Sequence, residues 1–297
     1  MLCGSLCANE RAMVEEPKRI KAFRLCIARD IPKFPNDKAT LTVLEQKPLA
    51  SLLIDYANWA IRYIAPRPRR IVVEEAASTD PRWQIHEADI RVILQKAGKG
   101  DDLTPYLSLQ PHTRGFTPSS SGTGPNVDRW ADKDFLLNAM GFHHLHLDAA
   151  PSNQMRSDDV LFVRVDRDTF TVAGIFNHSV FEATSVDVPM TTERERLWEI
   201  FDDHTTRGVP PGAVVVSSAI ATSGHPIYIV QLAMNYARVV REVDPKLDDL
   251  AYVGELYRHA GLQSPAKMKL KWHLQFLSLG VLDERNNLFI SLCNGPN

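Results

Sequence analysis

The hydrophobic residues of the N-terminal part recur at helical spacing. In residues 47–64 and again in 85–98 the apolar positions repeat every three or four residues, which is typical of a helix with one buried face. The prolines of "APRPRR" end the first segment, and Gly98 stands where the second helix should end. The pattern predicts a mainly helical N-terminal region.

From residue 140 the period changes to two. "FHHLHL" at 142–147 is followed by two runs of apolar, aromatic and β-branched residues, 160–165 and 169–176. The polar triplet 166–168 separates these two runs, as in a β-hairpin. We therefore expect a compact antiparallel sheet in the middle of the protein.

Helical patterns return after this sheet. Thr192 and Glu195 have the spacing of a capping box ahead of an apolar helix, and "GAVVVSSAI" at 212–220 predicts one more buried strand. A long apolar helix then begins at "HPIYIVQ", with Pro226 in its first turn.

The C-terminal part predicts helix 247–260, helix 265–279 behind Ser264-Pro265, and a strand at "NLFISL". This order of helix, turn, helix and strand is compatible with a winged helix. It would place a nucleic-acid-binding fold at the end of the chain.

Together these elements predict an α+β fold, a small antiparallel sheet flanked by helical regions at both ends. We expect three regions: a helical region at 1–125, a β-rich core at 126–222 and a helical region at 223–297. The stretch "TRGFTPSSSGTGPN" at 113–126, rich in Ser, Gly, Pro and Thr, is interpreted as the linker that closes the first region.

The composition says more about the cellular environment of the protein than about its function. A net charge of -2 gives no global attraction to a polyanion, so any contact with nucleic acid must be local. The four cysteines lie near the chain ends without CxxC spacing, which favours reduced thiols and a cytoplasmic protein. No stretch approaches the roughly 18 apolar residues that a membrane span needs, so no contact with a membrane is expected.

Candidate chemistry is concentrated in "GFHHLHLD", residues 141–148. In an extended strand alternate side chains share a face, so His144, His146 and Asp148 lie together while His143 falls on the leucine side. A further histidine, His178, follows the last strand of the expected sheet. If the strands pair in sequential order, His178 comes near the histidine strand.

Three interpretations of these histidines remain open. They could be structural side chains of a half-buried sheet, because histidine is intermediate in burial. They could be zinc ligands, because "HLHLD" contains the HxHxD part of the metallo-β-lactamase motif, although Ala149 stands where that motif continues with histidine. They could also perform acid–base catalysis without a metal.

The third interpretation is favoured by a resemblance over residues 141–181. "SDDVLFVRVDRDTFTVAGIFNHSVF" resembles the closing strands of RelE/YafQ-type ribonuclease toxins, with their "DWxLIY" strand and "GSHSDLF" terminus. Asp158 or Asp159 precedes the apolar strand as the family's aspartate does, and His178 and Phe181 match the terminal His and Phe, with one residue fewer between Ser and Phe. The tryptophan of the family's strand is absent here.

The resemblance implies RNA cleavage by attack of the 2′-hydroxyl on the adjacent phosphorus. Two histidines can remove and supply the protons, because their ordinary pKa lies near 6.5. We assign these roles to His146 and His178, with His144 as the third candidate and Asp159 as an orienting or proton-transfer group. The remaining candidates are two cations for the phosphate, Arg164 and Arg156, and an aromatic ring for a base, Phe181.

The sequence thus predicts a cytoplasmic, metal-independent endoribonuclease resembling a toxin or defence effector. It would need no cofactor, and its partners would be RNA and an antitoxin or another regulatory protein. Two alternatives stay open: a non-enzymatic nucleic-acid-binding or adaptor protein that uses the C-terminal region, and a zinc-dependent hydrolase built on "HLHLD".

Overall fold

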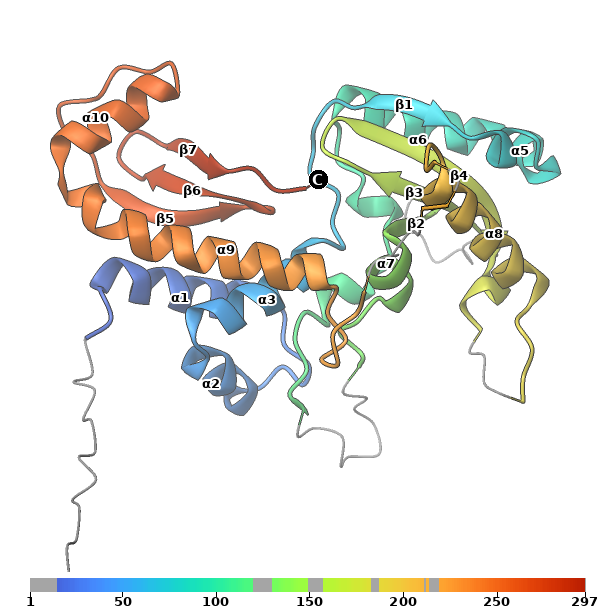
Figure 1. Ribbon diagram of the computed structural model, residues 1–297, viewed down its shortest axis with the longest axis horizontal. Coiled ribbons are helices and arrows are strands. Elements are labelled where there is room, and N and C mark those ends of the chain that lie inside the picture. Colours follow the sequence, from blue (N-terminus) through green and yellow to red (C-terminus); the bar gives the residue numbers. More distant parts are fainter. Residues whose placement is uncertain are drawn as a thin grey trace, which may run out of the picture.

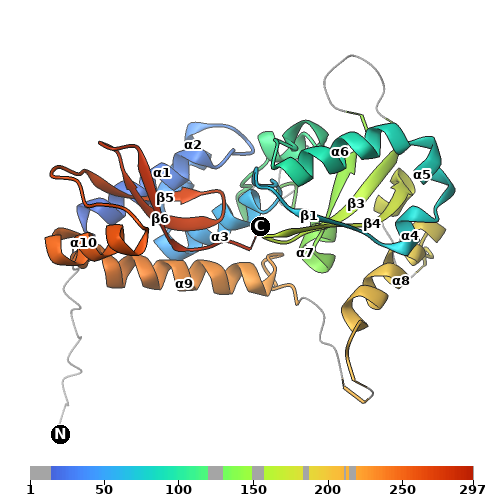
Figure 2. The same cartoon turned by 90° about the horizontal axis from the view of Figure 1, so that it is seen from above.

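The computed structural model describes residues 15–119, 130–148, 157–182, 187–210, 212–213 and 219–296. It has an α+β fold with helices at both ends, which confirms the expected fold class. Figures 1 and 2 show two groups of elements side by side along the long axis, each built around its own sheet.

The first group joins the two ends of the chain. Its helices and strands are α1 (Lys18–Asp30), α2 (Lys38–Gln46), α3 (Leu49–Ala60), α9 (Ile227–Val243), α10 (Leu250–His259), β5 (Leu270–Gln275), β6 (Ser278–Asp283) and β7 (Leu288–Cys293). β5, β6 and β7 form an antiparallel sheet in that order. One hydrophobic core connects them, with α3 lying along α9 (Figure 1).

The second group is built on a four-stranded sheet of order β1-β4-β3-β2. Its strands are β1 (Arg70–Val73), β2 (Phe142–His146), β3 (Asp159–Val165) and β4 (Thr169–Asn177). β2, β3 and β4 pair antiparallel in sequence order, as expected. The sheet is not wholly antiparallel, however, because β1 from the N-terminal region pairs parallel with β4.

Helices cover both faces of this sheet. Three short or amphipathic helices of the first third of the chain are α4 (Glu75–Ser78), α5 (Pro81–Ile85) and α6 (Glu87–Lys99). Apolar residues of α4 and α6 pack with one set of strand side chains, Leu145 and Leu161 among them. The opposite set, which includes Phe142 and Phe162, packs on α7 (Phe135–Met140) and α8 (Thr192–Thr206).

The hydrophobic cores combine residues from different expected regions. The core of the first group contains residues of both the 1–125 and the 223–297 regions, while β1 and α4–α6 of the first region lie on the central sheet. Whether the three regions are separate folding units stays a prediction. Of the expected linker, residues 115–118 are buried, and residues 120–126 lie outside the described part.

Two local predictions were wrong. Residues 265–279 contain no helix; they contain β5 and the start of β6, because Leu270, Trp272 and Leu274 alternate with polar residues and turn one side to the core. The winged-helix order therefore lacks its second helix. The cap of α8 is Thr191 rather than Thr192, since its side chain accepts from the Arg194 amide.

Most of the strand expected at 212–220 lies outside the described residues.

Within the described residues, no helix has both the length and the apolar character that crossing a membrane requires.

Candidate active site

The structure gathers the candidate histidines at a single cavity. The cavity, of about 510 Å³, lies at the free edge of β2, and its lining includes His144, His146, His178 and Phe181. The ring centroids of His146 and His178 are 5.7 Å apart, and those of His144 and His146 are 6.1 Å apart. Imidazoles from two segments more than thirty residues apart thus meet in one place.

The order of the strands produces this meeting. His146 pairs with Val160 near the start of β3, and Asn177 pairs with Asp159 at the end of β4. The end of β4 therefore lies beside the end of β2, with only β3 between them. His178 follows directly, in the short 3-10 turn η4 (His178–Phe181).

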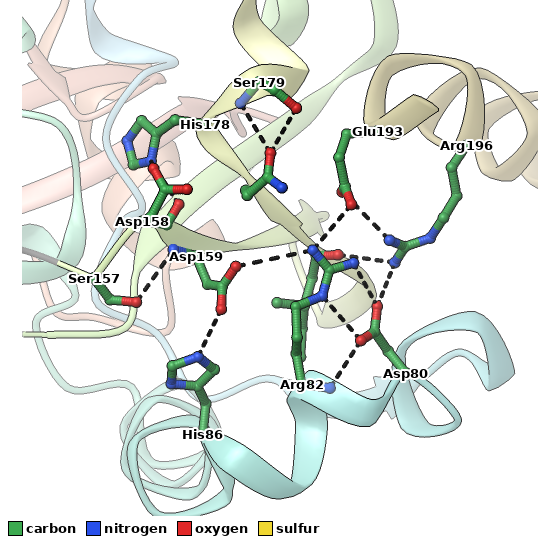
Figure 3. Close-up of polar contacts among 12 residues, drawn as sticks. Asp80, Arg82, His86, Ser157, Asp158, Asp159, His178, Ser179, Glu193 and Arg196 are labelled. Carbon is green, nitrogen blue, oxygen red and sulfur yellow. Dashed lines mark hydrogen bonds and ion pairs between the residues drawn. The ribbon is translucent and has the colours of Figure 1, made fainter. Parts of the chain in front are cut away.

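Backbone and side-chain contacts hold His178 in position. Asn177 accepts hydrogen bonds from the Ser179 amide at 3.0 Å and the Ser179 hydroxyl at 2.6 Å, so it caps the turn. Nδ1 of His178 lies 2.6 Å from the Asp158 carbonyl oxygen and 3.2 Å from the Asp158 carboxylate (Figure 3). Because both oxygens only accept, Nδ1 carries the proton and Nε2 is left for exchange with a ligand.

His144 has a carboxylate of its own. Asp134 caps α7 by accepting from the Leu137 amide at 3.0 Å, which fixes its side chain. Its other oxygen, Oδ2, lies 3.9 Å from Nδ1 of His144. Burial lowers the pKa of His144; the Asp134 charge opposes this, and the charge of His178 adds to it. His144 is consequently held in its neutral, proton-accepting form at neutral pH.

His143 also lines the cavity, but its Nε2 is engaged at the end of α3. Its Nε2 donates to the Ile61 carbonyl at 2.8 Å, which links β2 to the end of α3. Complete burial lowers the pKa of His143 to about 4, so the ring is neutral and serves as a structural tie.

Among the described residues, three cations that were not expected from the sequence line the cavity: Arg62, Lys133 and Arg194. Arg62 and Lys133 are almost completely buried, and desolvation lowers the pKa of Arg62 and of Arg194. Among the described residues, the Nε groups of both arginines have no hydrogen-bond partner. An anion in the cavity would offset this desolvation and accept their hydrogen bonds.

Phe181 also belongs to the cavity wall. Its ring lies 4.9 Å from that of His144 and 5.6 Å from that of His178, centroid to centroid. The ring is part-exposed and therefore available to an aromatic ligand.

Two sequence-based candidates lie elsewhere. Asp159 faces away from the cavity: its Oδ2 lies 2.9 Å from Nε2 of His86 and its Oδ1 lies 3.9 Å from Arg82 (Figure 3). Arg164 pairs with Phe142 at the opposite end of β2 from His146, and its Nε is 3.6 Å from Asp166. Asp158 and Asp134 are the carboxylates that face the histidines instead, and Glu182 also lines the cavity. Arg156 lies outside the described residues.

Asp159 belongs to a charged network that anchors α8. Asp80 binds both Arg82, at 2.8 Å, and Arg196, at 2.7 Å, and Glu193 binds the same two arginines (Figure 3). Burial of Asp80 would raise its pKa, but the hydrogen bonds and charges of the arginines outweigh burial and lower it.

The anchored helix in turn supports the turn that carries His178. Arg196 donates to the Ile175 carbonyl of β4 at 2.8 Å. Thr191 and Arg194 donate to carbonyl oxygens of η4, at 3.0 and 2.8 Å respectively. The network is therefore a scaffold for the site rather than part of its chemistry.

A partial signal for the missed residues exists in the sequence. "DKDFLLNAMG" has an aspartate cap and a terminal glycine, which predict a helix at 135–140 immediately before the histidine strand. Such a helix would place the cap, Asp134, near that strand. No pattern within the sequence marks Arg62, which lies in the turn after α3, some eighty residues before the histidine strand.

The described residues contain no group of three or more His, Cys, Asp or Glu side chains placed to hold a metal ion. Comparison with models of protein families, with curated proteins and with solved structures found no match to this chain. The function must therefore be inferred from the site.

Proposed function

We propose that the protein is a metal-independent endoribonuclease that cleaves RNA by transphosphorylation. The observation that supports this most strongly is the convergence of His144, His146 and His178 in one cavity with two incompletely paired arginines. The resemblance to RelE/YafQ-type toxins agrees with it but remains a prediction.

In this proposal the histidines have complementary roles. His144, neutral because burial lowers its pKa, accepts the proton of the 2′-hydroxyl. His178 donates a proton from Nε2 to the departing 5′-oxygen, and the Asp158 carboxylate balances its positive charge. The ring of His146 is near those of both His144 and His178, so it can contact the same reacting groups.

The cations supply the remaining requirement of the reaction. The attack places extra negative charge on the phosphoryl oxygens, and a guanidinium can bind two of them at once. Arg194 and Arg62 are the candidates, replacing Arg164 of the sequence-based prediction. Phe181 remains the candidate for stacking on a base.

The test is incubation of single-stranded RNA with the protein in excess EDTA. We expect products with 2′,3′-cyclic phosphate and 5′-hydroxyl ends, a loss of at least a hundredfold in rate for His144→Ala and for His178→Ala, and a smaller loss for His146→Ala. His259→Ala, at the end of α10 and outside the cavity, is the matched control.

Cleavage that EDTA abolishes, together with one bound zinc per chain, would favour the hydrolase alternative. RNA binding without cleavage, unaffected by the histidine substitutions, would favour the adaptor alternative.

A further inference from the structure

A second cavity lies beside the histidine cavity. It measures about 390 Å³, and its lining includes Arg29, Lys33, Phe34, Asn36, His112 and Thr113. It is formed where the end of α1 and the segment after it meet the 3-10 turn η2 (Gln110–His112).

The two cavities share one stretch of backbone as a common wall. Gln110 and Pro111 line the histidine cavity, while His112 and Thr113 line the second. Because residues 110–113 are consecutive, the two linings meet on neighbouring parts of one short turn.

The common wall is held firmly by α3 and the residues that follow it. Trp59 donates from Nε1 to the Pro111 carbonyl at 2.9 Å, and the Tyr63 hydroxyl is 3.3 Å from Nδ1 of His112. Arg62, which lines the histidine cavity, also donates to the Arg114 carbonyl. One short segment of chain therefore fixes both cavities relative to each other.

The lining of the second cavity is cationic and aromatic. Arg29 is largely exposed, at 67%, and its contact with Glu45 is long, at 3.6 Å. Lys33 lies with its Nζ 3.0 Å from the Ile31 carbonyl, and the described lining contains no carboxylate. The Arg114 guanidinium sits over the Phe34 ring, 4.6 Å from its centroid. Cations beside an aromatic platform suit the phosphates and bases of a single strand.

We infer that the second cavity binds nucleotides flanking the scissile bond, so that the substrate is an extended single-stranded RNA crossing residues 110–113. The inference rests on the proposed function for the position of the scissile bond. It does not need that function for the binding itself, since the cations would hold any single strand.

The experiment compares two uncleavable probes, a 2′-O-methyl dinucleotide and a 2′-O-methyl dodecamer of mixed sequence. The variant is Arg29→Ala/Lys33→Ala, and Arg91→Ala/Lys99→Ala, which removes two exposed cations from α6, is the matched control. We expect the wild type to bind the dodecamer more tightly than the dinucleotide, and the ratio of the two affinities to fall about tenfold in the variant.

Salt dependence gives a second readout. Removing two phosphate contacts should reduce the slope of log Kobs against log salt for the dodecamer by about 1.4, because each contact to a single strand contributes about 0.7. An unchanged affinity ratio and slope in the Arg29→Ala/Lys33→Ala variant would overturn the inference, as would equal losses in the control.

Cleavage of unmodified RNA is measured in parallel and separates the two proposals. If RNA is cut by the histidines but the dodecamer data do not change, the second cavity is not a nucleotide site. If no RNA is cut but the variant lowers dodecamer binding as expected, the binding site stands and the nuclease function fails.

Discussion

His144 and His178 lie in one cavity but are held by different kinds of contact. His178 is bound through Nδ1 to both the carbonyl and the carboxylate of Asp158. His144 is more buried than His178 and faces the Asp134 carboxylate at the longer distance of 3.9 Å. Environments that differ in this way allow two chemically identical groups to play opposite parts in proton transfer.

The substitution Asp134→Asn tests this assignment. Asparagine caps a helix as well as aspartate does, so α7 should keep its start and the fold its stability. Loss of the negative charge removes an interaction that favours the imidazolium form, so the already lowered pKa of His144 falls further.

If His144 is the general base, the acid limb of the kcat/KM profile should move to lower pH, and the rate above that limb should fall because a base of lower pKa accepts the proton less readily. An NMR titration of the histidines reports the pKa directly. Asp249→Asn, which alters the cap of α10 in the same way, should change neither measurement. An acid limb that stays in place would argue against His144 as the base.

Alanine substitution of two glycines tests how tightly β6 and α10 are packed. In β6, a Cβ at Gly280 would clash with the Ile290 carbonyl oxygen of the neighbouring strand and would lie 2.7 Å from the Phe289 ring. In α10, a Cβ at Gly254 would meet nothing within 4 Å.

The two alanine substitutions should therefore have opposite effects. Gly280→Ala forces β6 and β7 apart and should lower the free energy of unfolding by about 2 kcal/mol or more. Gly254→Ala should raise it by up to about 1 kcal/mol, because alanine is the better helix former. Urea denaturation followed by circular dichroism measures both, and a neutral Gly280→Ala would contradict the close approach of the two strands.

The elements that the sequence could predict are those with a long, regular period. The helix at 47–64 and the hairpin of β3 and β4 show such a period within one segment. The strand β1, four residues long, shows none, and its pairing with β4 joins residues about a hundred positions apart. The period of two in 268–274 was present but was outweighed by the preceding Ser-Pro signal for a helix start.

The same distinction holds for the site. Alternation placed His144 and His146 on one face, and sequential pairing brought His178 near them. The cations and carboxylates around them come from the turn after α3, from the residues just before α7 and β3, and from α8. No local pattern states which of these segments packs at the edge of β2. Asp159 was misplaced for a related reason: a strand's first residue can face either way, and His86 on the other side of the sheet decides it.

At the scale of the whole molecule, N-terminal and C-terminal elements of the chain share one hydrophobic core. α9 lies along α3, and residues of both helices share a core with α1 and the C-terminal sheet. Tyr236 of α9 and Tyr56 of α3 each donate a hydrogen bond to the turn between β5 and β6, at the carbonyls of Leu277 and Phe276. The C-terminal region therefore depends on N-terminal helices for one wall of its core.

This dependence predicts that residues 223–297, the region that the adaptor alternative would use, do not fold by themselves. Expressed alone, residues 223–297 would expose the apolar face of α9, including Ile229, Ala233 and Val240, which is buried in the whole chain. Since apolar burial is the main favourable contribution to folding, we expect no cooperative thermal transition from this fragment. Addition of residues 15–66, which supply α1–α3, should restore such a transition.

Circular dichroism of the separate and mixed fragments measures this, with residues 15–66 alone as the control. A fragment 223–297 that melts cooperatively by itself would show an independent C-terminal domain and would revive the adaptor alternative. If it folds only with α1–α3, then the segment 110–113, held by α3 between the two cavities, is tied through that helix to the C-terminal core. Damage to this distant core should then disturb the proposed RNA path without touching a residue that lines it.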